Sequence, residues 1–221
     1  METILVFKVS ELDLQKIKSF LLIMKEKIMS MASTMFLKLG FKSVTMDDIA
    51  TEMCISKKTI YKYFSNKELL IDESTEIFHR HIHEIINAIV LQNHNAIAEN
   101  FEIRKMFKDM FKSADTSPVY QLKKHYPGIY QNVITREIEE CNSIFMKNIT
   151  KGIEQGLYRK EIDIEIAAKF HYMLIFSIKE ETSSEKEGQQ LELEILEYHT
   201  RAIATTDGVK ELEKQLMNIE K

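Results

Sequence analysis

The helix-start signals near the N-terminus limit the fold of this chain most narrowly, because four of them fall within about forty residues. In residues 24–39 the apolar side chains recur at three- and four-residue spacing, and Gly40 follows as a C-cap. Thr45 and Asp48 then form a Thr-x-x-Asp capping box. These residues predict a first helix, a tight connection and a short second helix.

Two further helix starts follow directly. Ser56 is placed to cap a third helix over residues 57–64, and Ser65 and Glu68 form another capping box that opens a fourth helix. A short helix, a tight turn and a second short helix make up the helix-turn-helix arrangement, whose later helix enters the major groove of DNA. The region therefore predicts a tri-helical DNA-binding unit.

The third predicted helix separates an apolar face from a basic one. A step of about 100° per residue places Lys58 and Lys62 opposite Ile60. Phe64 lies on the same side as Ile60, and Tyr61 lies beside the lysines. This helix and its flanks hold four lysines and no acidic residue, so a polyanion would meet no repulsive charge. A solvated lysine face is the simpler interpretation, but it leaves the capping boxes and the preceding helix pair unexplained.

Positive charge gathers in this region although the whole chain is acidic. Residues 25–70 hold eight lysines against five acidic residues, an excess of three. Since the net charge of the chain is −4, the remainder carries −7. The positive charge is therefore concentrated near one end.

The composition favours long helices, because the 221 residues include only two prolines and six glycines. At 44% hydrophobic, the chain can bury a substantial core. We therefore predict an all-α fold. Beyond the fourth helix start, the periodicity and its breaks predict helices at 66–92, 95–112, 118–125, 127–156, 163–181, 189–206 and 208–219.

Several classes of function find no support in the sequence. The start of the chain lacks the pattern of a signal peptide, and the most apolar internal run, residues 170–178, is shorter than the roughly 18 residues that span a bilayer. Cys54 and Cys141 match no metal-ligand spacing and suit a reducing cytoplasm. Glycine-rich phosphate loops, nucleophile elbows and His-Glu-x-x-His pairs do not occur. We expect a cytoplasmic protein that is not an enzyme, has no cofactor and binds no membrane.

Three segments of the N-terminal region resemble the DNA-binding domain of the tetracycline-repressor (TetR) family. They are Thr45–Ala50, Ile55–Phe64 and Asn66–Leu70. A weaker motif, Gly152–Arg159 with Asp163, resembles the segment before the dimerisation helices of that family. The resemblance covers about residues 25–70 and leaves most of the remaining chain without a match.

The resemblance implies a three-helix helix-turn-helix domain at 24–70 and a helical effector-binding and dimerisation domain at 71–221. Residues 1–23 form an N-terminal extension that is longer than usual in the family. The resemblance also implies a repressor that binds a palindromic operator in double-stranded DNA as a homodimer. A small-molecule effector would favour a conformation with wrongly spaced recognition helices and so release the DNA.

The DNA-contacting residues follow from the resemblance and from the helix faces. Thr45 and Lys67 stand at predicted helix N-termini, where exposed amides and the helix dipole attract phosphate. The predicted DNA-binding residues are Thr45, Lys57, Lys58, Thr59, Tyr61, Lys62, Tyr63 and Lys67.

The dimer interface is expected on the helices at 163–181 and 189–206. The first is apolar nearly all round, as expected when one side packs on its own domain and the other on a partner. By resemblance the two helices pair across a twofold axis as a four-helix bundle. The predicted interface residues are Leu174, Ile178, Leu191, Ile195, Tyr198 and Ala202.

Aromatic and methionine side chains on the middle helices suggest an effector pocket for an apolar or amphipathic molecule. The predicted pocket residues are Phe78, His81, Met106, Phe107, Met110, Phe111, Tyr120, Tyr130, Phe145 and Met146.

His79 and His83 lie one helical turn apart and could begin a transition-metal site, but two ligands do not make a site. No cysteine or placed carboxylate accompanies them in the sequence, which favours a solvated or pocket-edge pair, and we predict no metal. A metal-responsive regulator and a helical protein-interaction module without DNA binding remain the alternatives to the repressor.

Overall fold

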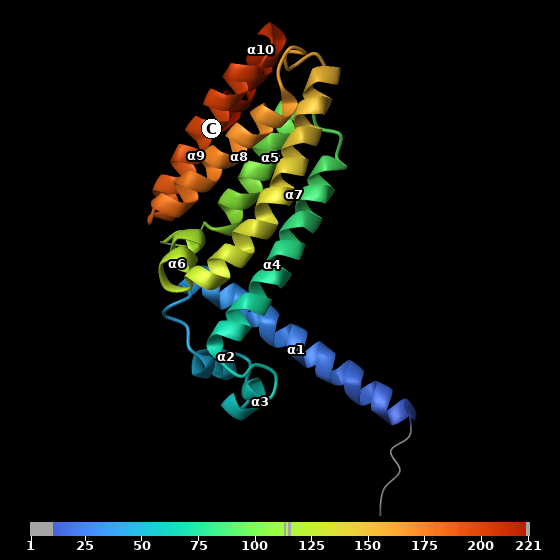
Figure 1. Cartoon of the computed structure of the whole chain (residues 1–221), viewed down its shortest axis with the longest axis vertical. Coiled ribbons are helices and arrows are strands. Elements are labelled where there is room, and N and C mark those ends of the chain that lie inside the picture. The colour runs from blue at the N-terminus through green and yellow to red at the C-terminus, as the bar shows by residue number, and fades with distance from the viewer. Residues whose placement is uncertain (1–10, 113, 115, 220–221) are drawn as a thin grey trace, which may run out of the picture.

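The computed structural model describes residues 11–112, 114 and 116–219, and this part of the chain folds into helices without a β-strand (Figure 1). The predicted all-α fold is confirmed. The helices are α1 (Glu11–Leu39), α2 (Met46–Glu52), α3 (Lys57–Tyr61), α4 (Lys67–Val90), α5 (Ala96–Met110), α6 (Pro118–His125), α7 (Pro127–Glu154), α8 (Ile164–Glu181), α9 (Glu185–Ile203) and α10 (Thr206–Ile219). None of these helices is both long enough and apolar enough to cross a bilayer.

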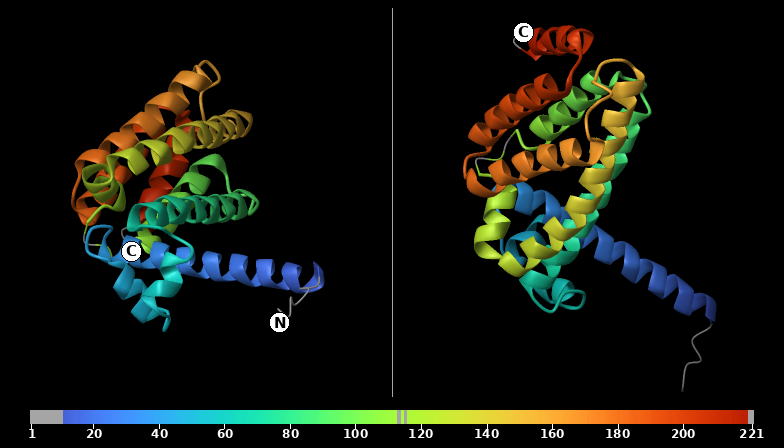
Figure 2. Two further views of the ribbon diagram at one scale, coloured as in Figure 1. Left: turned by 60° about the horizontal axis from the view of Figure 1, so that its bottom comes forward. Right: turned by 45° about the horizontal axis from the view of Figure 1, so that its top comes forward.

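Helices α2 and α3 lie at one end of the molecule, below a bundle formed by α4 to α10 (Figures 1 and 2). Within the bundle α7 packs on α4 and α8, and α8 packs on α9. Helix α4 belongs to both parts, since it starts next to α3 and packs on α1 before it continues into the bundle. A movement of α4 could therefore reach α2 through α1, which packs on both helices, and α3 through the short link between α3 and α4.

Helix α1 begins at Glu11, whereas the apolar periodicity predicted a start at Met24. Its sequence contains no glycine or proline, so nothing in it stops the helix from continuing toward the N-terminus. This added part projects from the body (Figure 2), and Phe20 and Leu22 are about three-fifths exposed at 62% and 59%. Of the predicted extension, residues 1–10 lie outside the described residues.

One hydrophobic core joins the helix-turn-helix to the bundle. It contains Phe36 of α1 and Phe41, which follows that helix, together with Leu122 of α6 and Tyr130 of α7. Between the two phenylalanines Gly40 ends α1 at a φ of +92°, a conformation that glycine adopts without strain. The connection is also polar, because the amide nitrogen of Phe41 donates a hydrogen bond to Oε1 of Gln121 at 3.0 Å. The two parts therefore pack as a continuous unit.

The weaker motif of the sequence has a structural role. The ring of Tyr158 lies directly over Gly152 of α7, where a Cβ atom would clash with it. Tyr158 is 2% exposed in a second core that includes Leu196 and Leu212. Asp163 caps α8 by accepting a hydrogen bond from the amide of Ile166. The motif thus fixes the chain reversal that leads into α8.

Candidate functional site

The second helix starts at the predicted capping box. The amide nitrogen of Asp48 donates to Oγ1 of Thr45 at 3.2 Å, and the amide nitrogen of Thr45 donates to Oδ2 of Asp48 at 2.8 Å. Ile49 and Ala50 are buried beneath the helix. Because the box satisfies two free amides, it sets where α2 begins and how it approaches α3.

The turn between α2 and α3 is a Schellman motif. The amide of Ile55 donates to the carbonyl oxygen of Ala50 at 2.9 Å, and the amide of Cys54 donates to that of Thr51 at 3.0 Å. Cys54 occupies the left-handed position with a φ of +53°. Glycine is the residue usually found there, since a side chain at positive φ is strained.

We therefore expect Cys54→Gly to stabilise the protein by about 1 kcal/mol, because relief of left-handed strain outweighs the greater freedom of an unfolded glycine. The measurement is the midpoint of urea unfolding. Cys54→Ser keeps the strained side chain, and its midpoint should stay close to that of the parent protein. A lower midpoint for Cys54→Gly would show that this turn is not strained.

Helix α3 presents the basic face that its sequence predicts. Ile60 and Phe64 are both 0% exposed in the core, whereas Lys58, Tyr61 and Lys62 are exposed. Among the described residues neither lysine has an acidic partner within 4.0 Å. The two ammonium groups and the tyrosine ring therefore face solvent, while Ile60 and Phe64 hold the opposite side of this segment in the core.

Other predicted DNA-binding residues have partners inside the domain. Nζ of Lys57 lies 2.6 Å from Oδ2 of Asp47 on α2, an exposed ion pair. Thr59 donates its amide to Oγ of Ser56, the cap of α3, at 3.1 Å. Tyr63 is half-buried against the core. Lys57 and Thr59 therefore also position α3, in addition to any contact with a ligand.

Lys67 stands at the start of α4. Its Nζ donates to the carbonyl oxygen of Lys42 at 3.2 Å and lies 5.9 Å from the ring centre of Phe36. Burial lowers the pKa of Lys67. The cap of α4 is Asn66, whose Oδ1 accepts from the amide of Leu69 at 2.8 Å, so the predicted cap, Ser65, was one residue too early. Asparagine is at least as good an N-cap as serine, so residue type alone does not decide between Ser65 and Asn66.

A cavity of about 180 Å³ lies inside the bundle, with walls from α1, α4, α5, α6, α7 and α8. Five of the predicted pocket residues line it: Phe78, Phe107, Phe111, Tyr130 and Phe145. Other apolar side chains that were not predicted also line the cavity, among them Leu37, Phe41, Leu122, Val133, Tyr172 and Phe176. The cavity is mainly apolar, and its wall also contains His79, Glu137 and Lys179.

The other five predicted pocket residues do not line this cavity. His81 and Met110 border a larger, more polar hollow of about 630 Å³ between α1 and α4, which Phe78 also borders. Met146 borders a hollow on the outer side of α7. Met106 and Tyr120 border none of these hollows. The amphipathic pattern identified the right helices, but it did not fix which of several adjacent side chains faces inward.

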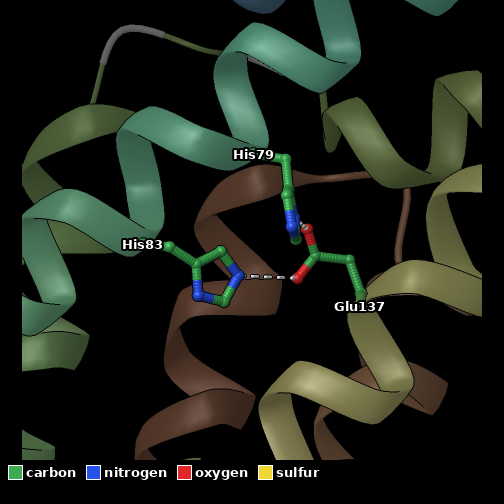
Figure 3. Close-up of side chains that lie close together, drawn as sticks. All are labelled: His79, His83 and Glu137. Atoms are coloured by element: carbon green, nitrogen blue, oxygen red, sulfur yellow. Dashed lines mark hydrogen bonds and ion pairs between the residues drawn. The ribbon is translucent and has the colours of Figure 1, made fainter.

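The histidine pair of α4 meets a carboxylate from α7 (Figure 3). Nδ1 of His79 bonds Oε1 of Glu137, and Nε2 of His83 lies 3.8 Å from Oε2 of the same residue. A hydrogen bond and the charge of Glu137 raise the pKa of His83 despite its burial. Burial alone would raise the pKa of Glu137, but the two histidines lower it. The sequence spacing could not reveal this carboxylate, which lies far along the chain.

Helices α8 and α9 carry an unusually exposed apolar surface. Of the predicted interface residues, Leu174, Leu191, Tyr198 and Ala202 are exposed, and Ile178 and Ile195 are half-buried. The exposed stripe on α8 also includes Ile166, Phe170 and Met173, which the prediction did not name. Phe170 is the most exposed of these three at 59%. Apolar side chains that are exposed together in this way are typical of a surface that a partner covers.

The fold and the α3 surface together describe a helix-turn-helix unit that is joined to a helical bundle. Residues 28–73 match the family model described as "Bacterial regulatory proteins, tetR family". The helix-turn-helix of this chain is therefore similar to that of the tetR family of bacterial regulatory proteins.

Two staphylococcal regulators are similar in sequence. The biofilm operon icaADBC HTH-type negative transcriptional regulator IcaR of Staphylococcus aureus strain Newman is 25% identical over 143 residues, which are 60% of this chain and 71% of that protein. IcaR of Staphylococcus epidermidis is 30% identical over 110 residues, which are 48% of this chain and 51% of that protein.

Solved structures share the fold. A transcriptional regulator from Cytophaga hutchinsonii has a TM-score of 0.66 at 18% identity, and the match covers 81% of this chain and 98% of that one. A regulator from Saccharomonospora viridis, solved in complex with choline, has a TM-score of 0.61 at 16% identity and covers 82% and 97%. The likeness therefore extends through the bundle as well as the helix-turn-helix.

Proposed function

We propose that this protein represses transcription as a homodimer that binds a palindromic operator and leaves it when a small apolar molecule fills the bundle cavity. It would act in the cytoplasm on double-stranded DNA. The observation that carries the proposal is the α3 surface, where Lys58, Tyr61 and Lys62 face solvent. The staphylococcal relatives described as negative regulators support repression rather than activation.

The chemistry of α3 suits the major groove. Two lysines without acidic partners attract phosphates, and an exposed tyrosine between them can contact phosphate or base edges. Thr45 and Lys67, at the starts of α2 and α4, are placed to bind phosphates on either side. We assign Lys57, Thr59 and Tyr63 a supporting part, since they also pack within the domain.

The cavity is placed to control this surface. Leu37 and Phe41 line the cavity and also belong to the core that surrounds α2 and α3. Helix α4 supplies further wall residues and begins beside α3. A ligand that moves these residues would shift α1 and α4 and change the spacing of the two recognition helices in a dimer.

The exposed stripe on α8 and α9 supports the dimer. A dimer would cover Phe170, Leu174 and Tyr198, and it would place two copies of α3 on one face of the assembly. Operators with twofold symmetry need that arrangement, because each half-site binds one recognition helix.

Replacing a lysine of α3 tests the proposed DNA interface. Lys62→Ala should weaken binding to specific and nonspecific DNA and, if one phosphate contact is lost, reduce the slope of log affinity against log salt by about 1 per site. Thermal unfolding should not change, because Lys62 is exposed. Fluorescence anisotropy over a salt series, with genomic DNA from upstream of the gene for this protein, gives the affinity and its salt slope.

The matched control removes a lysine from the bundle. Lys147 lies on the exposed side of α7, so Lys147→Ala changes the net charge by the same amount as Lys62→Ala and leaves α3 unaltered. Its affinity and slope should equal those of the parent protein. Equal effects of the two replacements would assign DNA binding to overall charge and remove α3 from the interface.

A further inference from the structure

We infer that His79, His83 and Glu137 form a binding site for a divalent transition-metal ion of the zinc class, which would join α4 to α7. The three side chains converge from two helices (Figure 3). Metal binding by this cluster does not depend on whether the protein binds DNA. Its role in regulation rests on the function proposed above.

The geometry is that of a nearly assembled ligand set. The two histidines are four residues apart on α4, so they project from one face of that helix, and their ring centres are 4.3 Å apart. One donor atom from each of the three residues lies within 4.8 Å of the others. A tetrahedral ion with bonds of about 2.0–2.1 Å needs roughly 3.3 Å between donors, so side-chain shifts of about 1 Å would complete the shell.

Burial also favours an ion at this position. The side chains of His79, His83 and Glu137 are only 13%, 15% and 19% exposed. Nε2 of His83 is fully buried, and its nearest polar partners are carboxylate oxygens, Oε2 of Glu140 at 3.2 Å and Oε2 of Glu137 at 3.8 Å. An ion bound to this nitrogen would replace this loose ion pairing with a direct bond.

The donor types select the class of ion. Two imidazoles and one carboxylate suit zinc and its first-row neighbours, whereas magnesium and calcium prefer shells made of oxygen alone. Oε2 of Glu140 lies 3.3 Å from Nε2 of His79 and 3.2 Å from Nε2 of His83, so this half-exposed residue can supply a fourth ligand. The neighbouring thiol of Cys141 is a poorer ligand, because burial and the charge of Glu137 raise its pKa to about 12.

The position of the site would allow a bound ion to affect the affinity for DNA. His79 and Glu137 both line the bundle cavity, so the ion would lie in its wall. It would also fix α4, the helix that continues from the helix-turn-helix, against α7. We therefore expect the bound ion to change operator affinity.

The test is a titration of the untagged full chain, stripped with EDTA, with zinc chloride in competition with a chromophoric chelator and without DNA. We expect one equivalent of zinc per chain. Loss of a second-shell partner weakens metal sites by about 10- to 100-fold, so loss of a direct ligand in His83→Gln or Glu137→Gln should weaken binding by at least about 100-fold.

The control is His81→Gln, which removes a histidine of the same helix whose side chain is 63% exposed and outside the cluster. It should bind zinc as the parent does, and circular dichroism melts should show that all variants are folded. No stoichiometric zinc binding by the parent, or equal binding by the cluster variants, would overturn the site and leave a histidine–carboxylate ion pair.

A second measurement separates the site from its regulatory role. Operator affinity is measured with and without zinc for the parent and for His83→Gln. A change in the parent alone supports regulation through this site. Zinc binding without a change at the operator would overturn the regulatory role, whereas absence of DNA binding under both conditions would contradict the function proposed above and leave the metal site standing.

Discussion

Replacing Phe64 by alanine is expected to lower the free energy of unfolding by about 3 to 5 kcal/mol, the usual cost of emptying a fully buried phenylalanine site. Phe64 is 0% exposed and packs in the core that includes Ile60 and Phe36. Its loss would free α3 from the domain, so DNA binding should be lost together with the fold. Urea unfolding with operator binding measured in parallel gives both quantities.

Tyr61→Ala is the matched control for Phe64→Ala. It removes an aromatic ring from the end of α3, three residues before Phe64, but that ring is 45% exposed on the outer face. Stability should stay within about 1 kcal/mol of the parent, while operator affinity falls. If Phe64→Ala unfolded no more readily than Tyr61→Ala, the assignment of the two faces of α3 would be wrong.

A charge in the exposed stripe of α8 is expected to break the dimer. Phe170→Glu should weaken association by about 100-fold, which corresponds to about 2.7 kcal/mol, because an apolar anchor is lost and a carboxylate would have to be buried. Sedimentation at micromolar concentration should show mainly monomer where the parent is a dimer. Operator binding should fall with the dimer, since one chain reaches only one half-site.

Leu91→Glu is the control for the dimer variant. Leu91 is 80% exposed at the end of α4, so the replacement adds the same charge to an even more exposed apolar position outside α8 and α9. It should sediment like the parent. Dissociation in both variants, or in neither, would remove the stripe on α8 from the interface.

The starts of α2 and α3 could be predicted to the residue because their signals are local, whereas α3 ends at Tyr61 and not at residue 64 as predicted. Thr45 meets Asp48 three residues later, and Ser56 caps α3 through Thr59, so each contact that starts a helix lies within one turn of sequence. The inward direction of Ile60 and Phe64 likewise follows from helical periodicity alone.

The candidate cavity was predicted only in part, because its walls are set by tertiary packing. Phe107 lines the cavity and the adjacent Met106 does not, although both are large and apolar. The rotation of α5 against α7 decides between them, and one helix sequence does not encode that rotation. Glu137 was missed for the same reason, since it reaches His79 only when α4 and α7 pack side by side.

The central claim is that two copies of α3 bind the half-sites of one operator. Selection from a random pool of duplex DNA with the purified full chain, followed by sequencing of the bound fraction, tests it most directly. We predict enrichment of an inverted repeat whose half-sites are about one helical turn, 10 to 10.5 base pairs, or a multiple of it apart. The repeat should disappear with the variant that carries Lys58→Ala and Lys62→Ala together. No enrichment over the starting pool would contradict the account and favour a helical protein-interaction module.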